Sequence, residues 1–125
     1  MIAVDTSSLI DWFAGHETRQ AVLIDQALDD ETLCLPPPVE AELLSFPGER
    51  PMLAEVLARL PRLEMQGDIW RRTGLTRRRL RALGLKAAFC DALIAQCCIE
   101  ADTPLITRDG DFRHFAAHCG LKLAG

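Results

Sequence analysis

The sequence predicts a single α/β domain in which helices cover both faces of a mostly parallel sheet. Short apolar runs typical of buried strands alternate with longer segments in which apolar residues recur every three or four positions. The chain has 125 residues, enough for one hydrophobic core but not for two, so residues 1–125 are expected to form one domain. Apolar residues make up 49% of the chain. No apolar run approaches about 18 residues, which predicts a soluble protein without a membrane span.

The N-terminal half is expected to hold two strands and four helices. Ile2–Val4 is predicted as a strand and not a signal peptide, because no basic segment or cleavage site accompanies it. One of the hydroxyl residues after Asp5 (Thr6, Ser7 or Ser8) is expected to cap the next helix, which Gly15 ends. In chain order we expect a strand at Ile2–Val4, helices at Leu9–Phe13 and Glu17–Leu28, a strand at Thr32–Leu35, and helices at about 37–46 and Glu49–Leu60.

The C-terminal half is expected to hold three strands and three helices. Asp91 could cap a helix at Ala92–Ala101, because its carboxylate can accept backbone N–H bonds that the first turn leaves free. Pro104 cannot extend that helix and precedes a strand. The expected elements are a strand at Leu63–Met65, a helix at Gly67–Leu83 that Gly74 could break, the helix Ala92–Ala101, a strand at Leu105–Thr107, a helix at Asp111–His118 and a strand at Leu121–Leu123.

Charge and cysteine content narrow the class of protein. A net charge of −4 argues against a protein that coats nucleic acid with its whole surface, but it allows a local basic patch. Five cysteines without C-x-x-C spacing indicate reduced thiols in the cytoplasm more than a disulfide framework or a zinc site.

Half of the 14 basic residues lie within positions 71–86. They could bind a nucleic-acid backbone or form a solvated helix face, and the sequence favours neither. Trp70 precedes this stretch, and packing in the core or in a dimer is expected for it more than base stacking. The basic residues are Arg71, Arg72, Arg77, Arg78, Arg79, Arg81 and Lys86.

Acidic residues follow two of the predicted strands. Asp5 comes directly after the first strand, and Asp109 follows the strand Leu105–Thr107 by two residues. In open parallel sheets, ligands bind outside the carboxyl ends of the strands, so these carboxylates suggest one acidic site. Taken singly, Asp5 and Asp91 could be helix caps, Asp109 a turn residue and Glu42 a surface charge.

The chemistry that such a site favours is metal-dependent hydrolysis of a phosphodiester. Crowded carboxylates repel and raise one another's pKa unless a cation lies between them. Oxygen ligands without histidine or cysteine suit Mg²⁺ or Mn²⁺ better than Zn²⁺. Such an ion can activate a water and hold phosphate oxygens. Glu40 and Glu42 lie on different faces of their helix, so only one of them can join the site, and helical geometry does not decide which.

These residues make the sequence resemble the PIN-domain family, in particular the VapC-type ribonuclease toxins of toxin–antitoxin pairs. The resemblance covers essentially the whole chain. It rests on VDTSSLIDW at the start, VEAELL around position 42, DALIAQCCIEADTPLITRDGDF and a short last strand. Residue by residue, the family's acidic cluster falls on Asp5, Glu42, Asp91 and Asp109. The family's glutamate precedes a leucine pair, which selects Glu42 over Glu40. Thr6, Ser7 and Thr107 match small hydroxyl residues beside the family's metal site, and Asp111 is kept as a reserve ligand.

The resemblance implies a PIN-like three-layer α/β/α sandwich whose sheet has four or five strands in the order 3-2-1-4-5. It implies Mg²⁺- or Mn²⁺-dependent endonuclease action on single-stranded or looped RNA. Asp5, Asp91 and Asp109 would hold the metal, and Glu42 would orient or deprotonate the attacking water. A homodimer and a VapB-type antitoxin, with a basic side chain in the acidic pocket, are the expected partners.

Other classes of function remain open at this stage. A PIN endonuclease could work in RNA processing without an antitoxin. A non-catalytic module could bind a basic peptide in the acidic pocket, and failure to bind Mg²⁺ or Mn²⁺ would favour it. A phosphatase with Asp5 as nucleophile is disfavoured, because position 7 is Ser and the D-x-D pattern is absent.

Overall fold

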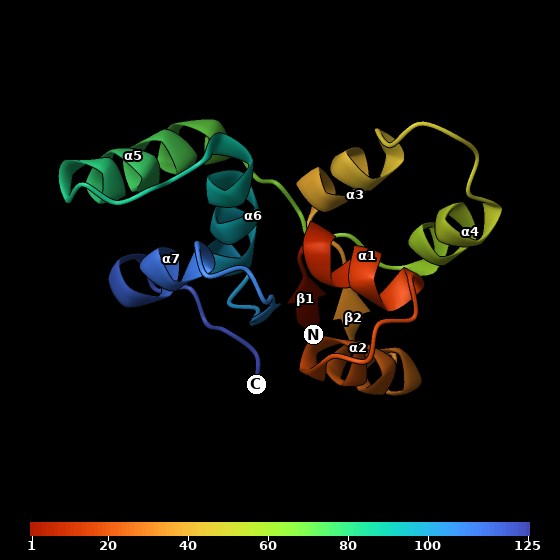
Figure 1. The fold of residues 1–125 in the computed structure, drawn as a ribbon. Helices are drawn as coiled ribbons and strands as arrows, with labels where there is room; N and C mark the ends of the chain where they lie inside the picture. The colour runs from red at the N-terminus through yellow and green to blue at the C-terminus, as the bar shows by residue number, and fades with distance from the viewer.

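The computed structural model describes residues 1–125 and places a short parallel sheet between layers of helices (Figure 1). In Figure 1, α6 and α7 lie on one side of the strands, α1, α3 and α4 on the other, and α2 below them. The elements are β1 (Ile2–Val4), α1 (Thr6–Phe13), α2 (Arg19–Asp29), β2 (Leu33–Cys34), α3 (Pro37–Leu44), α4 (Pro51–Arg59), α5 (Ile69–Ala82), α6 (Phe89–Glu100), β3 (Leu105–Ile106) and α7 (Phe112–Cys119).

The sheet has three parallel strands in the order β2-β1-β3. Single parallel bridges extend it on both sides, Leu35 with Arg62 and Leu105 with Leu123. The order 3-2-1-4-5 is therefore present, but the expected third and fifth strands are reduced to one bridge each, and the sheet itself has three strands instead of four or five. Pro61 has no N–H to extend the ladder at one edge. At the other edge the pairing consists of two backbone bonds, from Leu105 N to Lys122 O and from Ala124 N to Leu105 O.

Helix α1 begins earlier than the sequence pattern predicts. It starts at Thr6, and Asp5 is its cap, because the Asp5 carboxylate accepts the Ser8 N–H at 3.0 Å. The expectation that Thr6, Ser7 or Ser8 caps this helix is wrong, since an aspartate placed directly at a strand end is itself a good N-cap. The cap ties the carboxyl end of β1 to the start of α1. Gly15 has a positive φ of 77° just after the helix, in keeping with its expected role as a stop.

The boundaries of α5 and α6 also differ from expectation. Asp91 does not cap α6, because the helix already begins at Phe89 and Ala88 occupies the cap position. Nothing in the sequence breaks the helix between Ala88 and Asp91, and an acidic residue is favourable inside a first turn. Helix α5 runs through Gly74 without a break, since a single glycine within a helix costs only about 1 kcal/mol.

Helix α6 lies at the centre of the apolar core. Seven consecutive residues from Ala92 to Cys98 are buried, and the helix packs against α3, α5 and α7. Phe112 and Phe115 of α7 are among the largest fully buried side chains. This packing fixes the first turn of α6 relative to the carboxyl ends of β1 and β3. No helix of the structure is both long enough and apolar enough to cross a bilayer.

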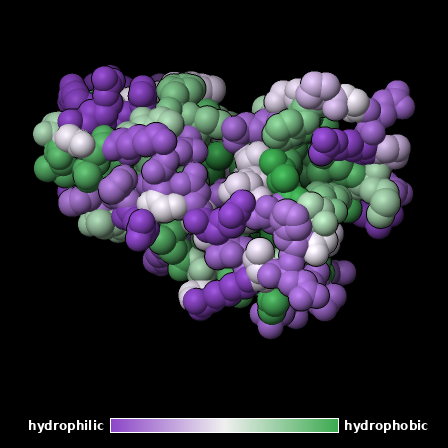
Figure 2. Space-filling view, viewed as in Figure 1, coloured by the Kyte–Doolittle hydropathy of each residue, from purple (hydrophilic) through white to green (hydrophobic).

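The surface is hollowed between two groups of helices. Figure 2 shows the hollow between the part formed by α5, α6 and α7 and the part formed by α3 and α4. The N-terminal ends of α1, α3 and α6 and the carboxyl ends of β1 and β3 all lie toward this region (Figure 1). Residues far apart in the sequence are thereby brought together at one place.

Candidate functional site

An acidic pocket of about 230 Å³ lies at this place. Its polar lining comes from the end of β1, the start of α1, helix α3, the first turn of α6 and the segment after β3. Ile10, Ile94 and Phe112 supply the apolar part of the wall. The other lining residues are Asp5, Thr6, Ser7, Glu42, Asp91 and Asp109. The structure thus brings together all four acids that the sequence analysis selected.

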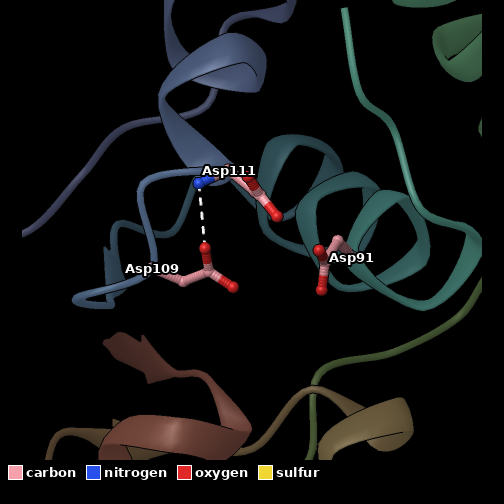
Figure 3. Close-up of side chains that lie close together, drawn as sticks. All are labelled: Asp91, Asp109 and Asp111. Carbon is pink, nitrogen blue, oxygen red and sulfur yellow. Dashed lines mark hydrogen bonds between the residues drawn. The ribbon is translucent and has the colours of Figure 1, made fainter.

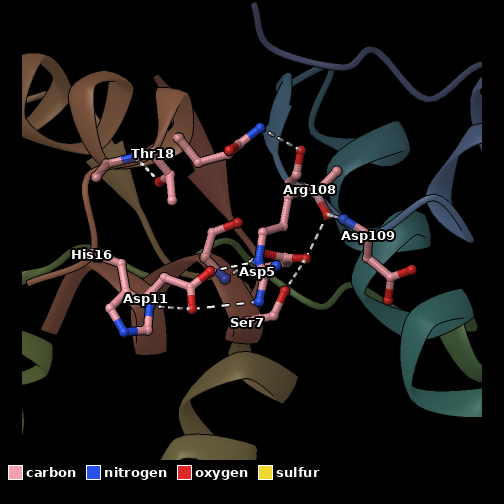
Figure 4. Close-up of polar contacts among 11 residues, drawn as sticks. Asp5, Ser7, Asp11, His16, Thr18, Arg108 and Asp109 are labelled. Carbon is pink, nitrogen blue, oxygen red and sulfur yellow. Dashed lines mark hydrogen bonds and ion pairs between the residues drawn. The ribbon is translucent and has the colours of Figure 1, made fainter. Parts of the chain in front are cut away.

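Asp5 is buried and held by three hydrogen bonds (Figure 4). One oxygen accepts the Ser8 N–H, and the other accepts Ser7 Oγ at 3.2 Å and Thr107 Oγ1 at 2.5 Å. Thr107 Oγ1 in turn accepts the Asp109 N–H at 3.0 Å. Two of the three hydroxyl residues expected beside the site therefore contact Asp5, and Thr107 links the Asp5 carboxylate to the backbone of Asp109.

Three carboxylates are grouped closely enough to hold a cation. One oxygen each from Asp91, Asp109 and Asp111 lies within 4.8 Å of the others (Figure 3). A tight turn brings Asp111 into this group, because its N–H donates to Asp109 Oδ1 at 2.9 Å. Asp5 lines the same pocket but is not part of the closest group, whereas the reserve residue Asp111 is. An all-carboxylate donor set fits a hard divalent cation such as Mg²⁺ or Mn²⁺.

The raised pKa of Asp91 also indicates a place for a cation. Burial, together with the negative charges of Asp109, Asp111, Glu42 and Asp5, raises the pKa of Asp91 from 3.8 to about 6, and burial has the largest effect. A cation in the pocket would offset this repulsion and favour the ionised form.

Glu42 lines the same pocket but is not part of the closest group. It accepts a hydrogen bond from Thr6 Oγ1 at 2.6 Å, so the third expected hydroxyl residue positions this carboxylate. Glu40 instead pairs with Arg62 outside the pocket. The Cys90 thiol lies close to Glu42, and burial together with this carboxylate raises the pKa of Cys90 to about 12, so the thiol stays protonated.

An ion pair between the exposed Arg108 and the buried Asp11 supports the turn that carries Asp109. Arg108 Nε lies 2.5 Å from Asp11 Oδ2, and His16 Nδ1 lies 3.3 Å from Asp11 Oδ1 (Figure 4). Arg108 stands between Thr107 and Asp109, so the pair fastens this turn to α1. Sequence reasoning missed it, because nothing in the spacing of Asp11 and Arg108 signals the contact.

Lys86 is the one basic side chain that pairs with the three-carboxylate group. Its Nζ lies 2.9 Å from Asp111 Oδ2. The bond to Asp111 raises the pKa of Lys86, and the charges of Asp109 and Asp91 act in the same direction. In the sequence, Lys86 follows the arginines of the preceding helix, and no spacing links it to the acidic site.

The arginines of α5 divide into two sets. Arg72 forms two hydrogen bonds with the Glu100 carboxylate, at 2.6 and 2.7 Å. Arg77 donates to Ala87 O at 2.8 Å and lies 5.8 Å above the centre of the Phe89 ring. The other four form no ion pair and make a hydrophilic surface on α5 (Figure 2): Arg71, Arg78, Arg79 and Arg81.

Trp70 is 60% exposed, so the expectation of core packing is wrong for the single chain, and packing in a dimer stays a prediction.

Comparisons with known proteins identify the family to which this fold belongs. The family model described as PIN domain matches residues 2–118. No curated protein sequence matches the chain.

Among solved structures, a VapBC2 complex from Rickettsia felis bound to promoter DNA is 22% identical, with a TM-score of 0.78 over 99% of this chain and 98% of that one. FitAcB from Neisseria gonorrhoeae is 18% identical, with a TM-score of 0.72 over 100% and 97%. A toxin–antitoxin complex from Klebsiella pneumoniae is 22% identical, with a TM-score of 0.70 over 97% and 95%. At these identities the likeness shows the fold.

Proposed function

This chain belongs to the PIN domain family, and from that premise we propose that it is a metal-dependent endoribonuclease and the toxin of a type II toxin–antitoxin pair. The observation that carries the proposal is the convergence of Asp5, Glu42, Asp91 and Asp109 in one pocket, with Asp111 in contact range. Carboxylates gathered in this way suit a divalent cation and phosphodiester chemistry.

The proposed roles follow from the contacts of each side chain. Asp5, Asp91 and Asp109 would hold Mg²⁺ or Mn²⁺, and Asp111 is placed to join them. When bound, such an ion supplies a Lewis acid for phosphate chemistry. Glu42, held by a hydrogen bond from Thr6, would orient or deprotonate the attacking water. Ser7 and Thr107 would keep the Asp5 carboxylate in one orientation.

RNA is the proposed substrate because helix α5 carries a basic surface. The unpaired arginines of α5 can bind a phosphate backbone, although the chain as a whole carries a net charge of −4. The five cysteines are free, as is typical of proteins in a reducing compartment, which supports action in the cytoplasm.

A VapB-type antitoxin is the proposed protein partner. An apolar groove of about 360 Å³ lies between α1, α3 and the start of α4 and is lined among others by Phe13, Leu43 and Met52. Ile10 lines both this groove and the acidic pocket, so the two adjoin at this side chain. A partner segment in the groove could therefore extend a basic side chain to the carboxylates. The toxin–antitoxin complexes with this fold support the assignment.

The test compares Asp5→Asn and Asp91→Asn with the wild-type chain in RNA cleavage with Mn²⁺. We expect both variants to lose cleavage, by about 10²-fold or more, while they keep the fold. Asp29→Asn is the matched control, because Asp29 is exposed at the end of α2. Wild-type cleavage by Asp5→Asn would contradict the metal-site assignment. Failure of the wild-type chain to bind Mn²⁺ would favour a module that binds a basic peptide.

A second test uses the gene next to the one that encodes this chain, where an antitoxin gene would be expected. Release of RNA fragments only when this neighbouring gene is absent would support a toxin over a processing nuclease. Sequencing the RNA ends in cells that express the chain with and without that gene measures this.

A further inference from the structure

Lys86 has an unusual place for a lysine in an acidic site. It lies in the connection between α5 and α6, and its ammonium contacts Asp111, one of the three grouped carboxylates. Its side chain is nevertheless 69% exposed. The lysine is therefore paired with the site but is not enclosed by it.

The backbone around Lys86 is fixed, although the side chain is not. Arg77 Nε donates to Ala87 O, the Leu85 N–H donates to Leu80 O at 3.0 Å, and Ala87 is buried. These contacts hold the connection that carries Lys86 against α5. A lysine stem has four rotatable carbons, so the ammonium can reach several positions from this fixed base.

We propose that Lys86 is a substrate-contacting residue whose ammonium balances Asp111 in the metal-free site and turns to an RNA phosphate when a divalent cation takes up that carboxylate. The inference rests on the proposed ribonuclease function and adds one residue to it. Asp91, Asp109 and Asp111 would hold such a cation, whose charge is twice that of the ammonium and would supply the counter-charge that Asp111 otherwise receives from Lys86. The released ammonium keeps three N–H donors and lies beside the place where the phosphate would sit.

Lys122 provides a matched control, because it is the only other lysine in the chain. Its Nζ lies 2.7 Å from Asp102 Oδ1, and its side chain is 63% exposed. Lys122 does not line the acidic pocket. Lys122→Met therefore removes the same charge and the same kind of ion pair at a place where the proposal expects no effect.

The first measurement is the dissociation constant of Mn²⁺, read from the spectrum of free Mn²⁺ during titration of the full chain. Lys86→Met should bind Mn²⁺ more tightly, by about two- to fivefold, because an exposed competing ion pair has been removed. Lys122→Met should bind Mn²⁺ as the wild type does. Weaker Mn²⁺ binding by Lys86→Met would mean that the lysine holds the site together, and it would overturn the proposal.

The second measurement is single-turnover cleavage of a single-stranded RNA at saturating Mn²⁺, together with RNA affinity as a function of salt. Lys86→Met should cleave about 10²-fold more slowly. Its plot of log affinity against log salt should be less steep by about 0.7, as expected for one lost phosphate contact. Lys86→Arg should recover part of the rate, since it keeps the charge.

Two outcomes separate this inference from the proposed function. If the wild type cleaves RNA and Lys86→Met cleaves it at the rate of Lys122→Met, the assignment of Lys86 is wrong and the ribonuclease function stands. If the wild type neither binds nor cleaves RNA, both are wrong. Melting temperatures of the variants show whether a lost activity reflects a lost fold.

Discussion

Asp91 makes the stability of the metal-free chain depend on pH. Its pKa is about 6 in the folded chain, above its ordinary value of 3.8, so folding favours the protonated form. The stability that this group contributes is full below pH 3.8 and is lost as the pH rises through about 6. We expect the melting temperature in a metal chelator to fall across this window. Asp91→Asn should flatten the dependence, since an amide does not titrate there.

The same titration should govern metal affinity. Below a pH of about 6 a cation must displace the proton on Asp91, so Mn²⁺ should bind more weakly in that range. Calorimetric titrations at several pH values measure this. Equal Mn²⁺ affinity on both sides of this pKa would contradict the placement of Asp91 in the metal site.

The ion pair between Arg108 and Asp11 should contribute to both stability and metal binding. In Arg108→Gln the buried Asp11 carboxylate loses its main partner, which should cost about 1–3 kcal/mol in free energy of unfolding. Mn²⁺ should also bind more weakly, because the turn that carries Asp109 loses its attachment to α1. Urea unfolding and metal titration measure the two effects.

Arg59→Gln is the control for this experiment. Arg59 pairs with Glu55 at 3.7 Å on an exposed face of α4, and such pairs contribute about 0–1 kcal/mol. An effect of Arg108→Gln no larger than that of Arg59→Gln would show that the pair of Arg108 with Asp11 does not support the site.

At the scale of the element, α5 should carry one set of arginines that binds substrate and another that stabilises the fold. Substitution of Arg78, Arg79 and Arg81 by Gln should leave the melting temperature nearly unchanged, because none of them has a partner in the structure. RNA affinity should fall, and its salt dependence should become less steep. Arg72→Gln should instead lower stability, since it breaks the bonds to Glu100. RNA binding that is unchanged across a salt titration would contradict the role of α5.

Sequence patterns predicted the positions of the elements better than they predicted the contacts between elements. Apolar spacing predicted every helix to within a few residues, and the placement of Asp5 and Asp109 after strands indicated that they meet at one edge of the sheet. The choice of Glu42 over Glu40 depended on the family resemblance, because helical geometry left both possible. The structure adds a tertiary reason, which is that Arg62 draws Glu40 away from the pocket.

Other parts of the site could not be predicted from spacing. Asp111 joins Asp91 because a local turn folds its backbone onto Asp109, and Lys86 reaches Asp111 only after α5 and α6 have packed together. The start of α6 was misplaced because Asp91 has the chemistry of a cap, whereas the structure uses it inside the first turn. A cap and a first-turn position are both favourable for an aspartate, so the packing of the helix determines which of the two Asp91 occupies.

At the scale of the whole molecule, we expect a homodimer at micromolar concentration. Trp70, Leu83 and Phe89 are large apolar side chains that lie exposed at or near the ends of α5 and at the start of α6. Light scattering should give about twice the chain mass of 13.9 kDa. Trp70→Glu should shift the mass toward that of one chain, because a charge would be buried in the contact. A monomeric wild type would contradict this prediction.

The pocket described above draws its carboxylates from both ends of the sequence, whereas the apolar groove uses only residues between Ile10 and Leu53. During synthesis on the ribosome, the groove segments therefore emerge well before Asp91, Asp109 and Asp111. A nascent chain, or one cut short by a premature stop before β3, lacks the pairing of β1 with β3 and two of the three grouped carboxylates, Asp109 and Asp111. On the proposed function, the residues that would bind an inhibitor are thus translated before most of the carboxylates that would hold the metal, and the order of translation itself would favour early contact with the inhibitor.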